Sequence, residues 1–194
     1  RDGASRDSFV MTGVYRHCMS GLGQTISWNG YEHNALLINE GGGQYANISF
    51  LAGISFEFDS RSVVSADLDL DGRPDLLVVE RDRLRNAYQT HGFVNYVHLV
   101  RNQIETGNHW LGVRLPLNDP RHLPHGAEVW VYAGGRKQML PVVTGDSYKA
   151  QHPVARHFGL GNVNQVDSVE VRWPNGRTTR VDKPEADQYI LVKP

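Results

Sequence analysis

Short runs in which apolar and polar residues alternate recur along the chain, and they predict β-strands. The clearest run covers residues 128–132, turns at a pair of glycines and returns through residues 137–143. A second such pair covers residues 168–173 and 178–181. Successive side chains of a strand point to opposite faces, so each of these sheets covers a core on one side only. No amphipathic run long enough for a helix is present, and nothing indicates parallel pairing. We therefore expect an all-β fold.

The strand signals fall into two regions, residues 1–92 and 93–194. In the first region, residues 34–39 and 45–50 flank three consecutive glycines and predict a hairpin. In the second region, two sheets that each cover one side of a core predict an antiparallel β-sandwich or barrel.

Composition narrows the class of protein. The chain has 194 residues, of which 40% are hydrophobic, which is enough for a real core. No apolar window approaches the length of a membrane span, so we expect none. The formal net charge is −1, and no basic stripe is available to bind phosphates, which argues against nucleic acid as a partner. Cys18 is the only cysteine, so an internal disulfide is excluded.

A run of alternating aspartates around Gly72 predicts a calcium loop. A hard cation such as Ca²⁺ takes six to eight oxygen ligands, and residues at alternate positions of a tight loop direct theirs to one point. Glycine supplies the sharp turn, because it accepts backbone angles that other residues resist. The predicted ligands are the carboxylates of Asp67, Asp69, Asp71 and Asp75 and the backbone carbonyl of Arg73.

Two alternatives compete with the calcium loop. An EF-hand needs an acid at position twelve, where this chain has Val78, and helices on both sides, whereas residues 62–66 and 76–79 read as strands. An acidic surface turn that binds nothing is the other alternative. A weak loop of this type fills where free calcium is near millimolar, so the sequence predicts a secreted, extracellular protein. A chain that begins at Arg1 fits a processed product or an excerpt. Asn47 opens a glycosylation acceptor triplet.

Several motifs carry a resemblance to known families. The segments concerned are Gly126–Val129, Gly145–Tyr148, His157–Gly161 and Val171–Gly176. Together they resemble the ASPIC/UnbV domain over about residues 96–192. The preceding region, with Asn39–Gly43 and the aspartate loop, resembles FG-GAP or VCBS repeats, the calcium-binding propeller repeats of integrin type. The resemblance implies Ca²⁺ on the loop and partial propeller-like blades, because one loop and about two blades are too few to close a propeller.

An unfinished blade leaves strand edges whose backbone groups need partners. Residues 8–15 predict a strand that one copy can lend to another. We therefore expect a calcium-binding structural or cell-adhesion module without catalytic activity. It would associate with copies of itself, as a homo-oligomer or filament, or with an extracellular protein or glycan partner.

An enzyme, either catalytic or accessory in a biosynthetic pathway, is the first rival. The histidines at positions 122, 125, 152 and 157 lack the spacing of a zinc motif. Ser147 lacks the second glycine of a nucleophile elbow, and residues 159–161 read as a turn rather than a dinucleotide loop.

A carbohydrate-binding module is the second rival. Its candidate platforms are Trp28, Tyr31, Trp110, Trp130 and Trp173. Large rings on alternating strands more often fill the space between sheets, so we expect core positions for them.

Overall fold

The computed structural model describes residues 33–56, 59–82, 94–117 and 123–194, and its regular elements there are all β-strands. The all-β prediction is confirmed. Within these ranges no helix has the length and apolar character that a membrane crossing requires. The strands are β1 (Leu37–Gly41), β2 (Gln44–Asn47), β3 (Asp59–Ala66), β4 (Asp75–Asp82), β5 (Val94–Val100), β6 (His109–Arg114), β7 (Glu128–Ala133), β8 (Arg136–Pro141), β9 (Arg156–Gly161), β10 (Val166–Arg172), β11 (Thr178–Asp182) and β12 (Gln188–Leu191).

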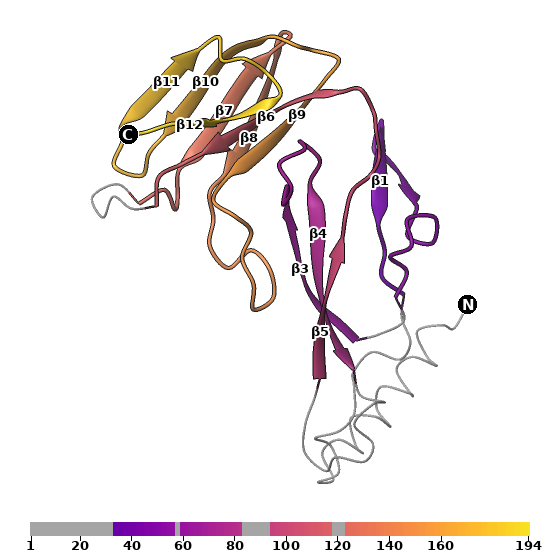
Figure 1. The fold of residues 1–194 in the computed structure, drawn as a ribbon. Helices are drawn as coiled ribbons and strands as arrows, with labels where there is room; N and C mark the ends of the chain where they lie inside the picture. The colour runs from indigo at the N-terminus through magenta and orange to yellow at the C-terminus, as the bar shows by residue number, and fades with distance from the viewer. Residues whose placement is uncertain (1–32, 57–58, 83–93, 118–122) are drawn as a thin grey trace. The chain divides into compact units, whose positions relative to one another are not determined.

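The strands form four small sheets (Figure 1). Their orders are β1-β2, β3-β4-β5, β12-β6-β9 and β11-β10-β7-β8. The described strands form neither a propeller nor a barrel. The predicted strand at residues 8–15 and the predicted boundary near residue 92 lie outside the described residues, so both stay predictions.

One pairing corrects the expectation of purely antiparallel sheets. β12 pairs with β6 in parallel, with Gln188 opposite Leu111 and Leu191 opposite Arg114. Asp187 fixes where the pairing of β12 with β6 begins. Its amide donates to the carbonyl of Trp110 at 2.7 Å, and its carboxylate accepts from the Trp110 amide at 3.1 Å. A four-residue apolar run carries no sign of its direction in a sheet, so the sequence pattern could not predict this pairing.

Residues 159–161 are part of strand β9 and not a turn, which is a second correction. β9 pairs antiparallel with β6 and buries Phe158 and Leu160 on one face. Gly159 is exposed and Gly161 has φ +63° at the end of the strand, near an irregular register. The two glycines therefore interrupt the apolar alternation in the sequence without breaking the strand.

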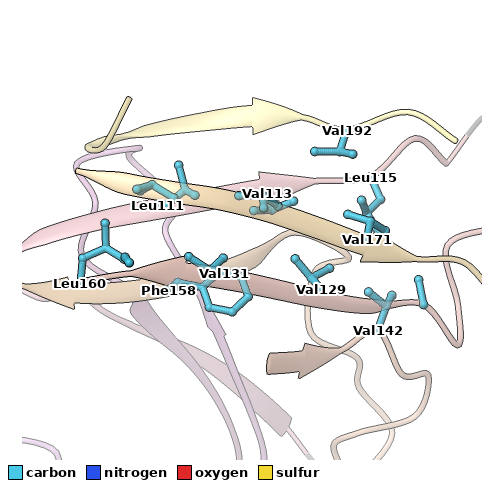
Figure 2. Close-up of a cluster of buried hydrophobic side chains, with 14 of the residues drawn as sticks. Leu111, Val113, Leu115, Val129, Val131, Val142, Phe158, Leu160, Val171 and Val192 are labelled. Atoms are coloured by element: carbon cyan, nitrogen blue, oxygen red, sulfur yellow. The ribbon is translucent and has the colours of Figure 1, made fainter. Parts of the chain in front are cut away.

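The core lies between two of these sheets (Figure 2). The buried side chains of β6 and β9 share one cluster with those of β7 and β10, and Val192, just after β12, belongs to it. Valine dominates this cluster, which suits strands because a β-branched side chain packs well on a pleated surface. Its members are Leu111, Val113, Leu115, Ala127, Val129, Val131, Ala133, Val142, Phe158, Leu160, Val166, Val169, Val171, Trp173 and Val192.

The chain divides into two compact units by its internal contacts. One consists of residues 1–61 and 79–97, and the other of residues 62–78 and 98–194. The second unit therefore contains both the aspartate loop and the shared core.

A matched pair of leucines tests the core. Leu111 is 0% exposed and Leu191, on the neighbouring strand, is 57% exposed. We expect Leu111→Ala to lower the free energy of unfolding by about 2–5 kcal/mol, because it removes buried methyl groups and leaves a cavity. Leu191→Ala should cost less than about 1 kcal/mol. Urea denaturation of both variants measures the difference, and equal losses would contradict the assigned core.

Candidate functional site

The aspartate loop joins β3 to β4 and brings three of the predicted ligands together. The carboxylate oxygens of Asp67, Asp69 and Asp71 lie within 4.8 Å of one another, so this trio could hold a metal ion. Leu70 and Gly72 both have positive φ, at 61° and 85°, and they turn the chain so that the aspartates converge. The flanking strands were predicted from the sequence, and they are confirmed.

Asp67 is held by three donors. The amide of Asp71 donates to Oδ1 at 3.0 Å, and the amide of Gly72 donates to Oδ2 at 3.0 Å. The hydroxyl of Tyr189 also donates to Oδ2 at 3.0 Å. Tyr189 lies on β12, so this contact joins the loop to the last strand of the chain. The sequence pattern alone could not identify it, because 122 residues separate the two partners.

Asp75 takes a different position from the trio. It is 2% exposed, and its two oxygens accept from the amides of Leu68 at 3.2 Å and Asn102 at 2.8 Å. The carboxylate thus satisfies buried backbone donors and ties the loop to the segment after β5. Buried polar groups of this kind need such partners, which gives Asp75 a structural role whether or not an ion is present.

Two guanidinium groups neutralise part of the loop charge. Arg101 lies 2.6 Å from a carboxylate oxygen of Asp69 and 3.7 Å from one of Asp71. Arg73 contacts Asp71 through Nη2 and donates from Nε to the carbonyl of Asn102 at 3.1 Å. Its amide also donates to Asp71. Arg101 was not among the predicted site residues, although a cation directly after β5 is a signal that could have indicated it.

These cations affect the ionisation of Asp71. Desolvation disfavours its charged form, but the hydrogen bonds and the charge of Arg73, together with the charge of Arg101, outweigh that effect and lower the pKa of Asp71 below 3.8. The carboxylate therefore stays charged at neutral pH. The same negative charge is available to a metal cation.

An aromatic cluster anchors the loop. A Cβ on Gly72 would lie 2.0 Å from Nε1 of Trp110, so only glycine leaves room for the ring. Trp110 stacks on His157 with ring centroids 5.1 Å apart and an interplanar angle of 17°. Tyr189 meets Trp110 edge-on at 5.0 Å. The three rings come from β6, β9 and β12, which places the loop against this sheet.

A second glycine accommodates Tyr189. A Cβ on Gly112 would lie 2.1 Å from the Tyr189 ring. Arg114, on the same strand as Gly112, places its guanidinium 4.4 Å from the centroid of that ring. Burial and the hydrogen bond to Asp67 raise the pKa of Tyr189 above its usual value, so its hydroxyl remains a donor. Burial lowers the pKa of His157, against the attraction of Asp67, and keeps that ring neutral.

The comparisons with known proteins bear on this unit. Residues 121–194 match the family model described as ASPIC and UnbV. This segment is an ASPIC/UnbV domain. The comparisons detect no FG-GAP or VCBS repeat, and no curated protein matches the chain. The match begins after β6, although β6 supplies the core residues Leu111 and Val113. The ASPIC/UnbV domain of this chain is therefore packed against a strand that precedes the matched residues.

Other candidate residues occupy structural positions. Ser147 donates from Oγ to the carbonyl of Val63 at 2.7 Å, which ties the ASPIC/UnbV domain to β3. His152 contacts Asp146 at 3.1 Å, and His122 lies outside the described residues. The aspartate trio is the group of three or more His, Cys, Asp or Glu side chains with metal-binding geometry in the described ranges.

The remaining single-residue predictions have mixed outcomes. Asn47 is exposed at the end of β2, so its side chain is accessible, and its glycosylation stays a prediction. Trp173 is buried in the core, as expected for a large ring. Trp130 is only half-buried and lies beneath the cations of Lys137 and Arg172. Trp28 and Tyr31 lie outside the described residues.

A pair of glycines tests the contact of loop and ring. We expect Gly72→Ala to displace Trp110 and destabilise the second unit. An alanine at this positive φ is strained, and its Cβ would overlap the ring. Gly107→Ala is the control, since its φ is also positive, at +67°, and no atom lies within 4 Å of the added carbon. The shift of the Trp110 indole proton in NMR spectra and the melting temperature measure both effects. Equal losses in the two variants would indicate backbone strain alone.

Proposed function

We propose that this chain is a secreted calcium-binding structural module, in which an ion on the aspartate loop fixes the loop against the ASPIC/UnbV domain. The observation that carries the proposal is the convergence of Asp67, Asp69 and Asp71 in a loop whose first aspartate also accepts from Tyr189. An ion at the trio would thus act on a residue that already contacts the domain. The proposed role is stabilisation and adhesion, without catalysis.

The donor set favours calcium among metal ions. Carboxylate oxygens suit hard cations, whereas zinc and copper prefer sites with imidazole or thiolate. The backbone carbonyl of Arg73 and one oxygen of Asp75 are the proposed further ligands. Asp75 would then exchange an amide donor for the ion. A calcium loop of modest affinity fills at the near-millimolar calcium concentrations found outside cells, which supports the proposal that the protein is secreted.

Calcium and Arg101 would compete for the same oxygens. Three carboxylates within 4.8 Å repel one another, and a divalent ion relieves that repulsion more fully than a partly exposed guanidinium. Binding of the ion therefore replaces the ion pairs of Arg101 with Asp69 and Asp71. The calcium affinity of the loop is reduced by the loss of these pairs.

Open strand edges support association with copies of the chain or with extracellular partners. All six residues of β8 are exposed, and it is the last strand at one edge of its sheet. The hairpin of β1 and β2 also exposes Leu37, Ile38 and Tyr45. A lone two-stranded hairpin is marginally stable in water, so a partner that pairs with it would stabilise it. Strand addition at such edges is the proposed route to a homo-oligomer, a filament or an adhesive contact.

The half-buried Trp130 favours the carbohydrate alternative in one respect. Its ring lies on the outer face of β7, and Glu128 accepts from its Nε1 at 3.0 Å. Lys137 and Arg172 approach the ring and compete with a sugar for it. Adhesion to a protein partner or a second copy is therefore the preferred proposal.

Calorimetry tests the metal site. We expect one Ca²⁺ per chain with a dissociation constant of about 10⁻⁴–10⁻³ M. Asp69→Ala combined with Asp71→Ala should abolish the heat of binding. Arg101→Gln should tighten calcium binding by roughly two- to fivefold, because the competing ion pair is lost.

Arg180→Gln is the control for this experiment. Arg180 is an equally exposed arginine whose ion pair, at 2.7 Å, is with Asp182 on β11, away from the loop residues in sequence. Its calcium affinity should equal that of the unchanged chain. An unchanged affinity in Arg101→Gln would exclude competition, and the absence of calcium uptake by the unchanged chain would overturn the proposed function.

Light scattering tests association. We expect assemblies larger than one chain in millimolar calcium and smaller species after chelation, because the loop orders the second unit. Met139→Lys should reduce assembly by placing a charge on the β8 edge, whereas Leu123→Lys, at an exposed loop position, should not. A monomer under both conditions would contradict self-association and leave only a separate extracellular partner.

A further inference from the structure

A cavity of about 660 Å³ lies within the second unit, beside the aspartate loop. Its volume falls in the range of sites for small molecules. The wall includes Asp67, Leu140, Val143, Asp146 and Arg156. Half of the lining residues are apolar, and the acidic and basic ones differ in how well they are satisfied by hydrogen bonds.

Among the charged residues of the wall, Arg156 has buried donors that lack hydrogen-bond acceptors. It is 9% exposed, and its Nη1 donates to the carbonyl of Pro153 at 2.9 Å. Its Nε and Nη2 are buried and have no hydrogen-bond partner among the described residues. Buried donors without acceptors are unfavourable, and the nearby charge of Asp146 does not supply a hydrogen bond to either nitrogen. A ligand that supplies hydrogen-bond acceptors to Nε and Nη2 would therefore stabilise the buried guanidinium.

The two free donors define the shape of that acceptor. Nε and Nη2 lie on one edge of the planar guanidinium and direct their N–H bonds in parallel. A carboxylate presents two oxygens at the matching separation, and such bidentate pairs are among the strongest hydrogen-bonded contacts in proteins.

The acids of the wall already have partners, so the cavity does not favour a cation. Asp146 accepts from the amide of His152 at 2.9 Å and contacts its ring, and Asp67 accepts from Tyr189. The hydrogen bond from the His152 amide is the main reason that the pKa of Asp146 is lowered. Burial lowers the pKa of Arg156, with Asp146 opposing it, but a guanidinium remains protonated at neutral pH.

The rest of the wall suits an apolar group. Leu140 and Val143 are both exposed although they are large and hydrophobic, and Pro141 and Pro153 extend the same surface. Covering such side chains contributes roughly 25 cal/mol for each Å² removed from water. A ligand that combines an anionic head with an apolar body would satisfy both parts of the wall.

We propose that this cavity binds small organic carboxylates with an apolar body, with the carboxylate on Nε and Nη2 of Arg156. Both nitrogens are hidden from solvent, so the Arg156 side chain or the wall beside it turns when the ligand enters. The proposal does not rest on the calcium site, because the carboxylate would be held by Arg156, although Asp67 of the loop also lines the cavity.

Binding of octanoate to the full chain in calcium-containing buffer tests the proposal. Calorimetry and saturation-transfer NMR would compare it with octanamide, which has the same body without the charge, and with inorganic phosphate. We expect octanoate to bind at least about tenfold more tightly than either, because a charge-assisted bidentate contact is lost in octanamide and the apolar contact in phosphate.

Arg156→Met should weaken octanoate binding at least about tenfold. Arg180→Met, a charge removal on the exposed strand β11, should leave it unchanged. If Arg156→Met fails to fold, Val143→Glu gives a second test at an exposed position, where the new carboxylate should repel octanoate but not octanamide. The proposal would be overturned if octanoate did not bind, or if it bound no more tightly than octanamide or phosphate. It would also be overturned if octanoate binding were unchanged in the Arg156 or Val143 variant.

Discussion

Two aromatic rings in the space left by two glycines hold the second unit together around its loop. Trp110 occupies the position of a side chain on Gly72, and Tyr189 occupies that of a side chain on Gly112. Because the rings also contact each other at 5.0 Å, a shift of either one disturbs both glycine contacts. The hydroxyl of Tyr189 then reaches Asp67, so the packing of the domain and the charge of the loop are joined at one residue. The geometry of the candidate metal site thus depends on steric fit as well as on electrostatics.

The loop manages its negative charge without an ion by three kinds of donor. Backbone amides hold Asp67 and Asp75, a phenol contacts Asp67, and the guanidinium of Arg101 pairs with Asp69. An ion at the trio would compete with the guanidinium groups of Arg101 and Arg73, whereas the amides that hold Asp67 would stay in place. The amide contacts pre-organise the loop, which reduces the conformational entropy lost on binding. A loop of this kind would bind calcium with modest affinity and retain its turn when the ion is removed.

Local pattern sufficed for most strands and for the aspartate trio, because alternation and spacing depend on neighbouring residues. The long-range contacts could not be read in this way. Strand β9 was missed because Gly159 and Gly161 interrupt its apolar run, and the parallel direction of β12 depends on where the chain returns. Arg101 and Tyr189 reach the loop from distant segments, so their roles follow from tertiary pairing and not from spacing.

Arg156 shows how a functional signal hides within a structural pattern. It occupies the first of three buried positions on β9, in alternation with Phe158 and Leu160, where an apolar residue would be expected. An apolar side chain there would avoid the desolvation of a charge, and replacing buried charges by hydrophobic groups is often neutral or stabilising. A cation at a core-facing position therefore has an energetic disadvantage that its single bond to Pro153 does not offset. Binding of an anion in the adjoining cavity would offset it, which connects a buried charge short of hydrogen-bond partners with the apolar wall beside it.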